Sequence, residues 1–229
     1  MEVAARSKKN QYGRQHRSDG ERSRQAILKA ASELATVEGL EGLSIARLAD
    51  YVGMSKSGLF AHFKSKEELQ LATIDTASAI FDREVFEPAL AASPGLARVM
   101  AFCEAFFSHL ERRVFPGGCF FISVAAEFDA KSGAVRDYAL AAYSRVLAKA
   151  NEFFCEAQEK GELDNREDIA QLSFELYSFL LSVNFAHVFF RDPTALARGR
   201  ESIRQRLARA MPSKRTTRKR SRGAKSRTK

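Results

Sequence analysis

The sequence predicts an all-α fold, and three observations support this. Apolar residues recur at helical spacing through most of the chain, no stretch alternates apolar and polar residues as a strand would, and Gly and Pro separate the helical runs. The 229 residues are 45% hydrophobic and 28% charged, which indicates a globular chain able to bury a core. We expect nine helices, forming one ordinary domain or two small ones.

The first four helices are expected within the first third of the chain. Each is placed by its apolar spacing, by a Ser before its first turn or by a Gly or Pro after its last. The expected ranges are 22–38, 45–51, 56–63 and 65–85. Caps are expected from Ser44, Ser55 and Ser65, and Glu68 completes a capping box with Ser65. Gly39 and Gly53 end the first two helices, and Pro88 follows the fourth.

Five more helices are expected in the remainder of the chain. Their ranges are 96–111, 119–128, 134–160, 164–190 and 193–209. Pro116-Gly117-Gly118 separates the first two, and Gly161 ends the third. Asp164 with Glu167 makes a box-like start for the fourth, and Pro193-Thr194 begins the last.

Positive charge is concentrated at the two ends of the chain. The net charge is +9, yet residues 25–213 contain 21 basic and 25 acidic residues, whereas residues 214–229 contain nine basic residues and no acid. We expect a flexible basic arm over residues 1–21 and a disordered basic tail over 212–229. The tail is interpreted either as a DNA clamp that acts through phosphates or as a solvated segment.

Several classes of protein are disfavoured. Cys103, Cys119 and Cys155 are too few and too scattered for a disulfide framework or a zinc site, and the first residues lack the apolar run of a signal peptide. This predicts a cytoplasmic protein. No catalytic triad, metal-binding histidine pair or phosphate loop is present. We therefore expect no enzyme activity, metal or cofactor, and interpret Cys119 as packing rather than as a redox sensor.

Residues 44–69 carry the most informative pattern. Two short helices joined by Gly53-Met54 suit a helix-turn-helix, with Leu59 and Phe63 holding the second helix against the core. The second helix then presents small or polar residues outward, as a recognition helix in a DNA major groove does. These outward residues are Lys56, Ser57, Gly58 and His62.

This stretch resembles the TetR family of transcriptional regulators. The resemblance covers about residues 22–72 and rests on Gly39, Ser44, Gly53-Met54-Ser55, Leu59-Phe60, His62-Phe63 and Ser65-Lys66-Glu67-Glu68-Leu69. It implies a nine-helix fold with a helix-turn-helix DNA-binding domain, 22–70, and a ligand-binding and dimerisation domain, 71–211. The implied DNA contacts are Ser44, Ser55, Lys56, Ser57, Gly58, Phe60, His62 and Lys66. Phe60 stands where family members often have Tyr, and Gly58 where they often have Thr.

The larger domain is rich in phenylalanine, of which the chain has 18, with no tryptophan. Apolar pockets for small molecules are lined by such side chains. We expect a pocket between the middle helices that holds a small apolar ligand of unknown identity, with Phe106, Phe121 and Phe154 among its walls.

The stretch 169–190 is apolar on nearly every side, so both of its faces must be buried. Its longest charge-free run has 15 residues and includes Ser178, Ser182 and Asn184, so it falls short of the roughly 20 apolar residues that a bilayer requires. We expect no membrane span. The resemblance implies a homodimer through the last two helices, with Leu176, Leu180, Val183 and His187 at the interface.

The sequence bears on three candidate functions. The sequence favours a sequence-specific DNA-binding transcriptional regulator, a repressor that a small apolar ligand releases from a palindromic operator. The alternative of another class is a nucleic-acid-coating protein whose basic ends dominate binding, which would lose most of its affinity without residues 212–229. A small-molecule enzyme built on the helical body would need a catalytic pair, and none is found.

Overall fold

The computed structural model describes residues 2–212, with side chains from residue 20 onward, and within this range it contains helices and connecting loops but no strands. The elements are α1 (Glu2–Glu38), α2 (Ile45–Val52), α3 (Lys56–Phe60), α4 (Lys66–Phe81), the π-helical turn η1 (Asp82–Phe86), α5 (Glu87–Ala91), α6 (Leu96–Glu111), α7 (Phe120–Phe128), α8 (Ala134–Glu159), α9 (Ile169–Val188) and α10 (Ala195–Ala210). Because α4, η1 and α5 follow one another without a break, they form one helical rod. The nine expected helices and the all-α class are confirmed for the described residues.

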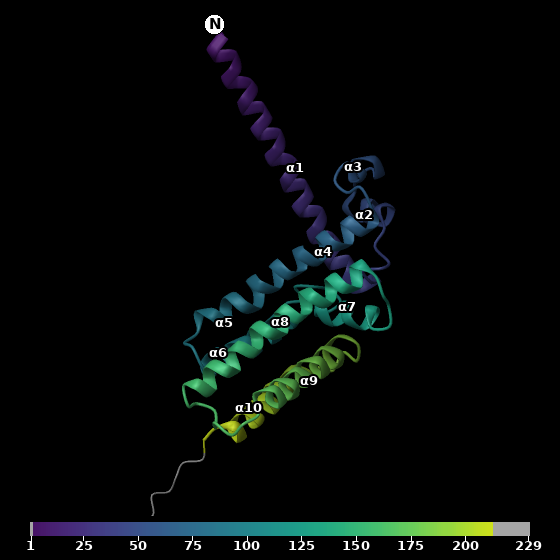
Figure 1. Cartoon of the computed structure of the whole chain (residues 1–229). Helices are drawn as coiled ribbons and strands as arrows, with labels where there is room; N and C mark the ends of the chain where they lie inside the picture. The colour runs from purple at the N-terminus through teal and green to yellow at the C-terminus, as the bar shows by residue number, and fades with distance from the viewer. Residues whose placement is uncertain (1, 213–229) are drawn as a thin grey trace, which may run out of the picture.

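Helix α1 begins at Glu2, twenty residues before its expected start at Arg22. The predicted helix start at Arg22 is therefore wrong, and the flexibility expected of residues 1–21 stays a prediction. The segment contains no Pro, and its Ala, Arg, Lys and Gln residues favour helix, so Gly13 and Gly20 weaken the helix without ending it. Figure 1 shows this half of α1 projecting away from the rest of the molecule. The predicted tail lies outside the described residues from 213 onward.

The rod formed by α4, η1 and α5 continues past Pro88, where the fourth helix was expected to have ended. Proline has no amide hydrogen and crowds the preceding turn of an α-helix, so it needs a local change of register. The π-helical turn immediately before it supplies that change: the amide of Glu87 donates to the carbonyl of Asp82, five residues back. The helix therefore does not end before Pro88; a wider π-helical turn at Asp82–Phe86 lets it continue through the proline.

Helix α9 starts at Ile169 and not at Asp164. Its cap is Asp168, whose side chain accepts hydrogen bonds from the amides of Ala170 and Gln171 at 3.0 and 3.2 Å. Asp164 is engaged elsewhere, because its amide donates to the carbonyl of Ala210 and its carboxylate binds the Arg166 side chain. The prediction of a helix start at Asp164 is wrong, since a tertiary contact to the end of α10 holds that residue in a loop.

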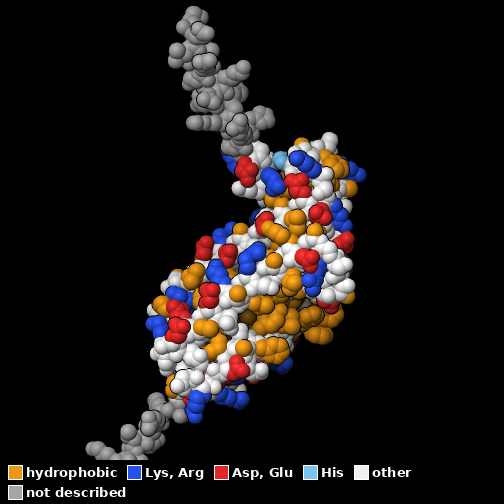
Figure 2. Space-filling view, in the orientation of Figure 1, with side chains coloured by type: hydrophobic (Ala, Val, Ile, Leu, Met, Phe, Trp, Pro, Cys, Tyr) orange, Lys and Arg blue, Asp and Glu red, His pale blue; other side chains and the backbone are white. Residues whose placement is uncertain are grey.

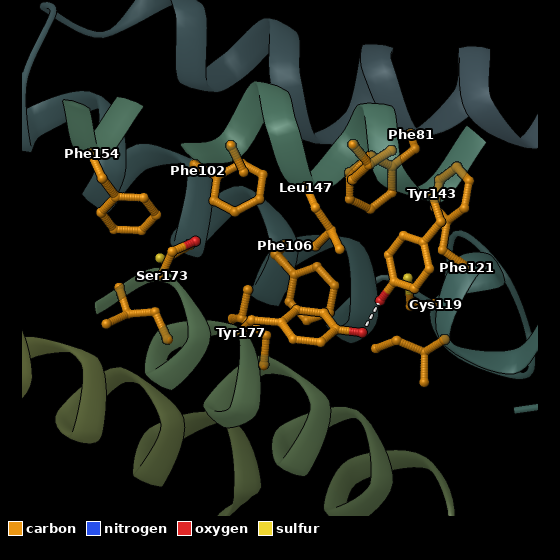
Figure 3. A pocket seen from close by; sticks show the side chains of 16 residues that line it. Phe81, Phe102, Phe106, Cys119, Phe121, Tyr143, Leu147, Phe154, Ser173 and Tyr177 are labelled. Atoms are coloured by element: carbon orange, nitrogen blue, oxygen red, sulfur yellow. Dashed lines mark hydrogen bonds between the residues drawn. The ribbon is translucent and has the colours of Figure 1, made fainter. Parts of the chain in front are cut away.

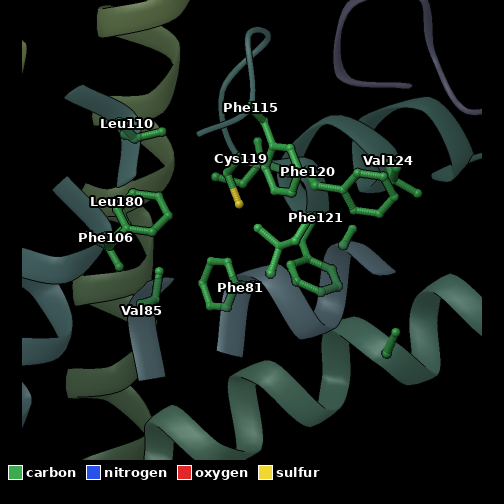
Figure 4. Packing of buried hydrophobic residues seen from close by; sticks show 14 of the residues in the cluster. Phe81, Val85, Phe106, Leu110, Phe115, Cys119, Phe120, Phe121, Val124 and Leu180 are labelled. Carbon is green, nitrogen blue, oxygen red and sulfur yellow. The ribbon is translucent and has the colours of Figure 1, made fainter. Parts of the chain in front are cut away.

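The helix-turn-helix lies at one end of the molecule and α10 ends at the other, with the α4 rod leading from the first into the body (Figure 1). One hydrophobic core runs through both parts, from Leu48 and Phe63 in the amino-terminal helices to Leu207 in α10. Phenylalanines make up much of its centre, where Phe81, Phe120 and Phe121 pack edge to face (Figure 4). A continuous core provides a physical link between the two ends.

Candidate nucleic-acid interface and ligand cavity

The helix-turn-helix is set by three serine caps, all at the predicted positions. Each side-chain oxygen accepts a hydrogen bond from the amide three residues further on, which satisfies a donor that the first helical turn leaves free. The pairs are Ser44 with Arg47 at 3.1 Å, Ser55 with Gly58 at 3.1 Å and Ser65 with Glu68 at 3.0 Å. The hydroxyls of Ser44 and Ser55 thus start α2 and α3.

The turn between α2 and α3 depends on Gly53. Its φ of 69° lies in the left-handed region that glycine adopts without strain, and its amide donates to the carbonyls of Ala49 and Asp50. Behind the turn, Leu48, Leu59 and Phe63 have no exposed surface. These contacts fix the orientation of α3 even though it spans only Lys56–Phe60, three residues fewer than expected.

Helix α3 carries four of the eight predicted DNA contacts, and His62 follows just after its end. Lys56, Ser57 and Phe60 are exposed, whereas Gly58 and His62 are half-buried. The side chain of Phe60 is 56% exposed, a high value for an aromatic residue with no partner on this face. The structure therefore brings the predicted base-facing residues onto one surface, and their contact with DNA stays a prediction.

Ion pairs divide the lysines and arginines around this surface into two groups. Lys66 pairs with Glu41 at 3.4 Å, and Arg47 binds Glu38, which holds the pKa of the Glu38 carboxyl below its usual range. The side chains of Lys56 and Lys64 are exposed and make no ion pair with the described residues. Lys64 was missed by the sequence analysis, although its place directly before the capping Ser65 puts it at the same helix start as Lys66.

The loop that joins α1 to α2, residues 39–44, is held by two other helices. From α7, the Glu127 carboxylate accepts hydrogen bonds from the amides of Leu40 and Glu41 at 2.7 and 2.8 Å. From α4, the buried Gln70 amide donates to the carbonyl of Leu40 at 2.9 Å. Gly39, with φ 84°, lets the carboxylate approach, since a Cβ there would lie 2.7 Å from a Glu127 oxygen. Nothing in the sequence indicates this contact, because its residues lie 86 and 87 positions apart.

A cavity lies in the body between α4, α6, α7, α8 and α9, lined by 16 residues (Figure 3). Phe106, Phe121 and Phe154, the three predicted wall residues, all line it, and so do Phe81 and Phe102. None of the 16 side chains is charged. The expected pocket walls thus meet at one cavity, and the binding of a ligand there stays a prediction.

The polar groups of this cavity are few. The hydroxyls of Tyr143 and Tyr177 hydrogen-bond to each other at one side of it, as Figure 3 shows, and Ser173 adds a third hydroxyl. Cys103 and Cys119 also line it, and burial raises the pKa of their thiols to about 12 and about 11. At neutral pH both thiols keep their protons, which supports the interpretation of Cys119 as packing.

The predicted dimer contacts on α9 need correction. Leu176, Leu180 and Val183 are only 2%, 6% and 5% exposed, and the first two line the cavity, so all three face the chain's own interior. His187 is half-buried. The outward face of the same helix instead carries exposed Phe174 and Phe185 and half-buried Leu181. The all-apolar composition of the stretch predicts burial of both faces but does not tell which residues lie on each.

Within the described residues, α9 is the one helix long and apolar enough to cross a membrane. Its inner face, however, packs against α8 and α10 within the hydrophobic core. A packed helix of a globular protein satisfies the same length and hydropathy criteria, so this property does not indicate a membrane span.

Comparisons with known proteins agree with this architecture. The family model described as bacterial regulatory proteins, tetR family, matches residues 27–73, and the model described as tetracyclin repressor-like, C-terminal domain, matches residues 95–203. No curated protein matches the chain significantly.

Solved structures share the fold at low sequence identity. A TetR transcriptional regulator from Chloroflexus aurantiacus J-10-FL has a TM-score of 0.76 at 21% identity, with 83% of this chain and 96% of that chain covered. A TetR family regulator from Cytophaga hutchinsonii has a TM-score of 0.72 at 19% identity, covering 84% and 96%. AibR, solved in complex with isovaleryl coenzyme A and operator DNA, has a TM-score of 0.58 at 22% identity, covering 70% and 85%.

The two family models match the two parts of the chain that the structure distinguishes, the helix-turn-helix end and the helical body. The chain therefore belongs to the TetR family of DNA-binding transcriptional regulators.

Proposed function

We propose that this regulator is a homodimeric cytoplasmic repressor that binds a palindromic operator and leaves it when a small apolar ligand enters the cavity of the body. The observation that carries the proposal is the loop between α1 and α2, which is held by Glu127 from a cavity-lining helix. A change in the cavity thus has a short mechanical route to the DNA-binding helices. The division into a DNA-binding part, 22–70, and a ligand-binding and dimerisation part, 71–211, belongs to the same proposal.

On the DNA side, α3 would enter the major groove with Lys56, Ser57 and Gly58 towards the bases. Ser44, Ser55, His62, Lys64 and Lys66 would contact phosphates. The small residues Ser57 and Gly58 in the first turn of α3 allow its backbone to come close to base edges. Phosphate contacts around it fix its register on the duplex but carry no sequence information.

A palindromic site follows from two-fold symmetry, because two recognition helices about 34–36 Å apart read half-sites one helical turn apart. The outward face of α9 supports such a dimer. Phe174, Leu181 and Phe185 recur there at helical spacing, and Phe189 beyond the helix end is 75% exposed. Hydrophobic side chains gather on the surface between α8 and α9 in Figure 2. Exposed apolar surface of this kind is typical of a protein interface.

The coupling would run through α7. Cys119, Phe121 and Ile122 at its start line the cavity, and Glu127 near its end holds the loop between α1 and α2. A nine-residue helix moves as a rigid rod, and Phe121 and Glu127 are about 9 Å apart along it. A ligand that pushes on Phe121 would therefore move the Glu127 carboxylate. A ligand can lower DNA affinity in this way only if it binds the conformation that cannot bind DNA more tightly than the conformation that can.

One structural neighbour supports the combination of the two sites. The AibR structure contains both a small molecule, isovaleryl coenzyme A, and operator DNA. The same helical architecture therefore accommodates both kinds of partner, and for this chain each partner remains a proposal.

The test is selection of binding sequences from randomised duplex DNA by the full chain at about 150 mM salt. A palindromic consensus is expected, and its half-site spacing measures the separation of the recognition helices. Lys56→Ala should weaken binding about 5- to 10-fold, whereas Lys160→Ala, an exposed lysine beside the far end of α8, should leave it unchanged. Absence of any consensus, with affinity that collapses as salt rises, would instead support a nucleic-acid-coating protein.

A further inference from the structure

The wall of the cavity contains no group that could neutralise a charged ligand. All of its 16 side chains are uncharged, and phenylalanines form much of its surface. The nearby Lys149 on α8 is directed elsewhere: its ammonium group pairs with Asp82 at 2.9 Å and lies over the Phe86 ring. An ion moved from water into such surroundings loses its hydration without gaining a partner, which opposes its binding.

The hydroxyls of Tyr143 and Tyr177 have an unused hydrogen-bonding capacity. Each hydroxyl can donate one hydrogen bond, yet the two groups form only the bond to each other, with no further partner among the described residues. One of the two protons is therefore free to be donated. Donation within the pair also polarises the second hydroxyl and strengthens it as a donor.

The position of this pair is fixed by its neighbours. The Tyr143 ring stacks on Phe121 with 5.3 Å between centroids, and Tyr177 meets Tyr143 edge on at 6.1 Å. Figure 3 shows both hydroxyls on one side of the cavity and Ser173 on another, with aromatic side chains between them. The cavity thus has an apolar centre and a preset donor at one side.

We propose that the ligand is an electrically neutral, largely aromatic or aliphatic molecule with a hydrogen-bond acceptor, such as a carbonyl oxygen, that accepts from the Tyr143–Tyr177 pair. This inference rests on the proposed function, since it names the chemical class of ligand for the same cavity. Carboxylates and ammonium compounds of equal size are excluded by the uncharged wall. Cys103 and Cys119 also line the cavity, and burial raises the pKa of both thiols, which disfavours their reaction with an electrophilic ligand.

The test uses four probes of matched size built on one benzene ring. Acetophenone is neutral with a carbonyl acceptor, cumene is neutral without one, benzoate is anionic and benzamidinium is cationic. Their binding to the full chain at neutral pH is measured by titration calorimetry or by chemical-shift changes. Acetophenone should bind at least about tenfold more tightly than either ion, because the ions pay an uncompensated desolvation cost. The affinity of cumene should lie between that of acetophenone and that of the two ions.

The double variant Tyr143→Phe/Tyr177→Phe tests the role of the hydroxyls. It should weaken acetophenone binding about 5- to 10-fold, the usual effect of one lost hydrogen bond, and leave cumene binding unchanged. Unchanged cumene binding also shows that the variant cavity is intact. Benzoate or benzamidinium binding as tightly as acetophenone would overturn the proposal. So would the failure of both neutral probes to bind, or acetophenone binding that the double variant does not change.

A separate measurement distinguishes this inference from the proposed function. Acetophenone is titrated into the complex of the protein with its selected duplex, and DNA release is followed. Tyrosine-dependent binding without release would leave the ligand class standing and refute the proposed release from the operator. DNA release by benzoate but not by acetophenone would support a ligand-released repressor and refute the neutral class.

Discussion

At the residue scale, His109 on α6 is an unusual member of the core. Its side chain is 1% exposed, and neither ring nitrogen has a hydrogen-bond partner among the described residues. It packs edge on against Phe81 and Phe115, at 5.8 and 5.4 Å between ring centroids. Burial lowers its pKa from 6.5 to about 4, with a smaller opposing effect from Glu84. The ring is therefore neutral in the folded protein at physiological pH.

This depressed pKa predicts the direction of a pH effect on stability. Between pH 6.5 and about 4, the unfolded chain binds a proton at His109 that the folded chain does not, so stability is lost as the pH falls through this range. The free energy of unfolding should fall by about 3 kcal/mol over this pH range. Above pH 6.5 the contribution of His109 to stability should stay constant. In His109→Phe the loss should disappear. Urea unfolding of both proteins across the range measures it, and parallel pH profiles would contradict the prediction.

Residue-scale prediction from the sequence succeeded where a local pattern decides the outcome. Ser44, Ser55 and Ser65 cap helices as expected, because a cap requires only a side-chain oxygen and an amide three residues away. The same rule fails at Asp164, where the end of α10 competes for the backbone. Glu127 could not have been found, since its partners lie in a distant loop and a lone glutamate on a helix is usually solvated.

At the element scale, the decisive feature is the contact of α7 with the loop between α1 and α2. Glu127 accepts hydrogen bonds from two amides of that loop, and Lys131 lies 3.9 Å from the carboxylates of both Glu41 and Glu127. Gln70 holds the same loop from α4. The helix-turn-helix is therefore positioned by two helices, of which only α4 is continuous with it in sequence.

Glu127→Ala removes both acceptors and tests this role. We expect a loss of about 1–3 kcal/mol in local stability, because the part-buried amide of Leu40 and the exposed amide of Glu41 lose their acceptor. Amide hydrogen exchange at Leu40 and Glu41 should accelerate, and affinity for the selected duplex should fall several-fold. The control is Glu104→Ala, which also truncates a surface glutamate but removes an ion pair with Arg200 on another side of the body. Equal exchange rates in the wild type and Glu127→Ala would show that α7 does not position the loop.

The helices themselves were predictable to different degrees. Helix α6 occupies the expected range, 96–111, because apolar spacing and the flanking glycine agree. The rod of α4, η1 and α5 was expected to stop before Pro88, since proline usually ends a helix and a π-helical turn has no recognised sequence signal. The long amino-terminal part of α1 was missed because its polar sequence has no apolar periodicity, although its Ala, Arg, Lys and Gln residues favour helix.

At the scale of the whole molecule, the fold class, the order of the two parts and the cavity follow from the sequence, whereas the faces of α9 do not. A helix that is apolar all round gives no periodic signal, so only the packing of α8 and α10 against it shows which side is turned inward. Leu176 and Leu180 face the cavity, and Phe174 and Phe185 face outward. Variants at the outward residues of α9, such as Phe185, therefore test the proposed dimer.

Phe185→Glu should convert the proposed dimer into a monomer. The side chain is 46% exposed in the chain alone, so the variant can fold, yet a carboxylate on each side of a two-fold interface would meet its own copy in an apolar contact. Light scattering should give half the mass of the wild type. Affinity for the full palindrome should fall about 100-fold or more, because two linked half-sites gain that much from simultaneous engagement, while binding to one half-site stays the same.

The matched control is Leu90→Glu, since Leu90 on α5 is also 46% exposed but lies on another face of the body. It should remain dimeric and bind the palindrome as the wild type does. If Leu90→Glu dissociates the dimer and Phe185→Glu does not, the interface lies along the α4–α5 rod and not on α9. In that case the recognition helices would be held at a different separation, and the half-site spacing of the selected duplex would record it.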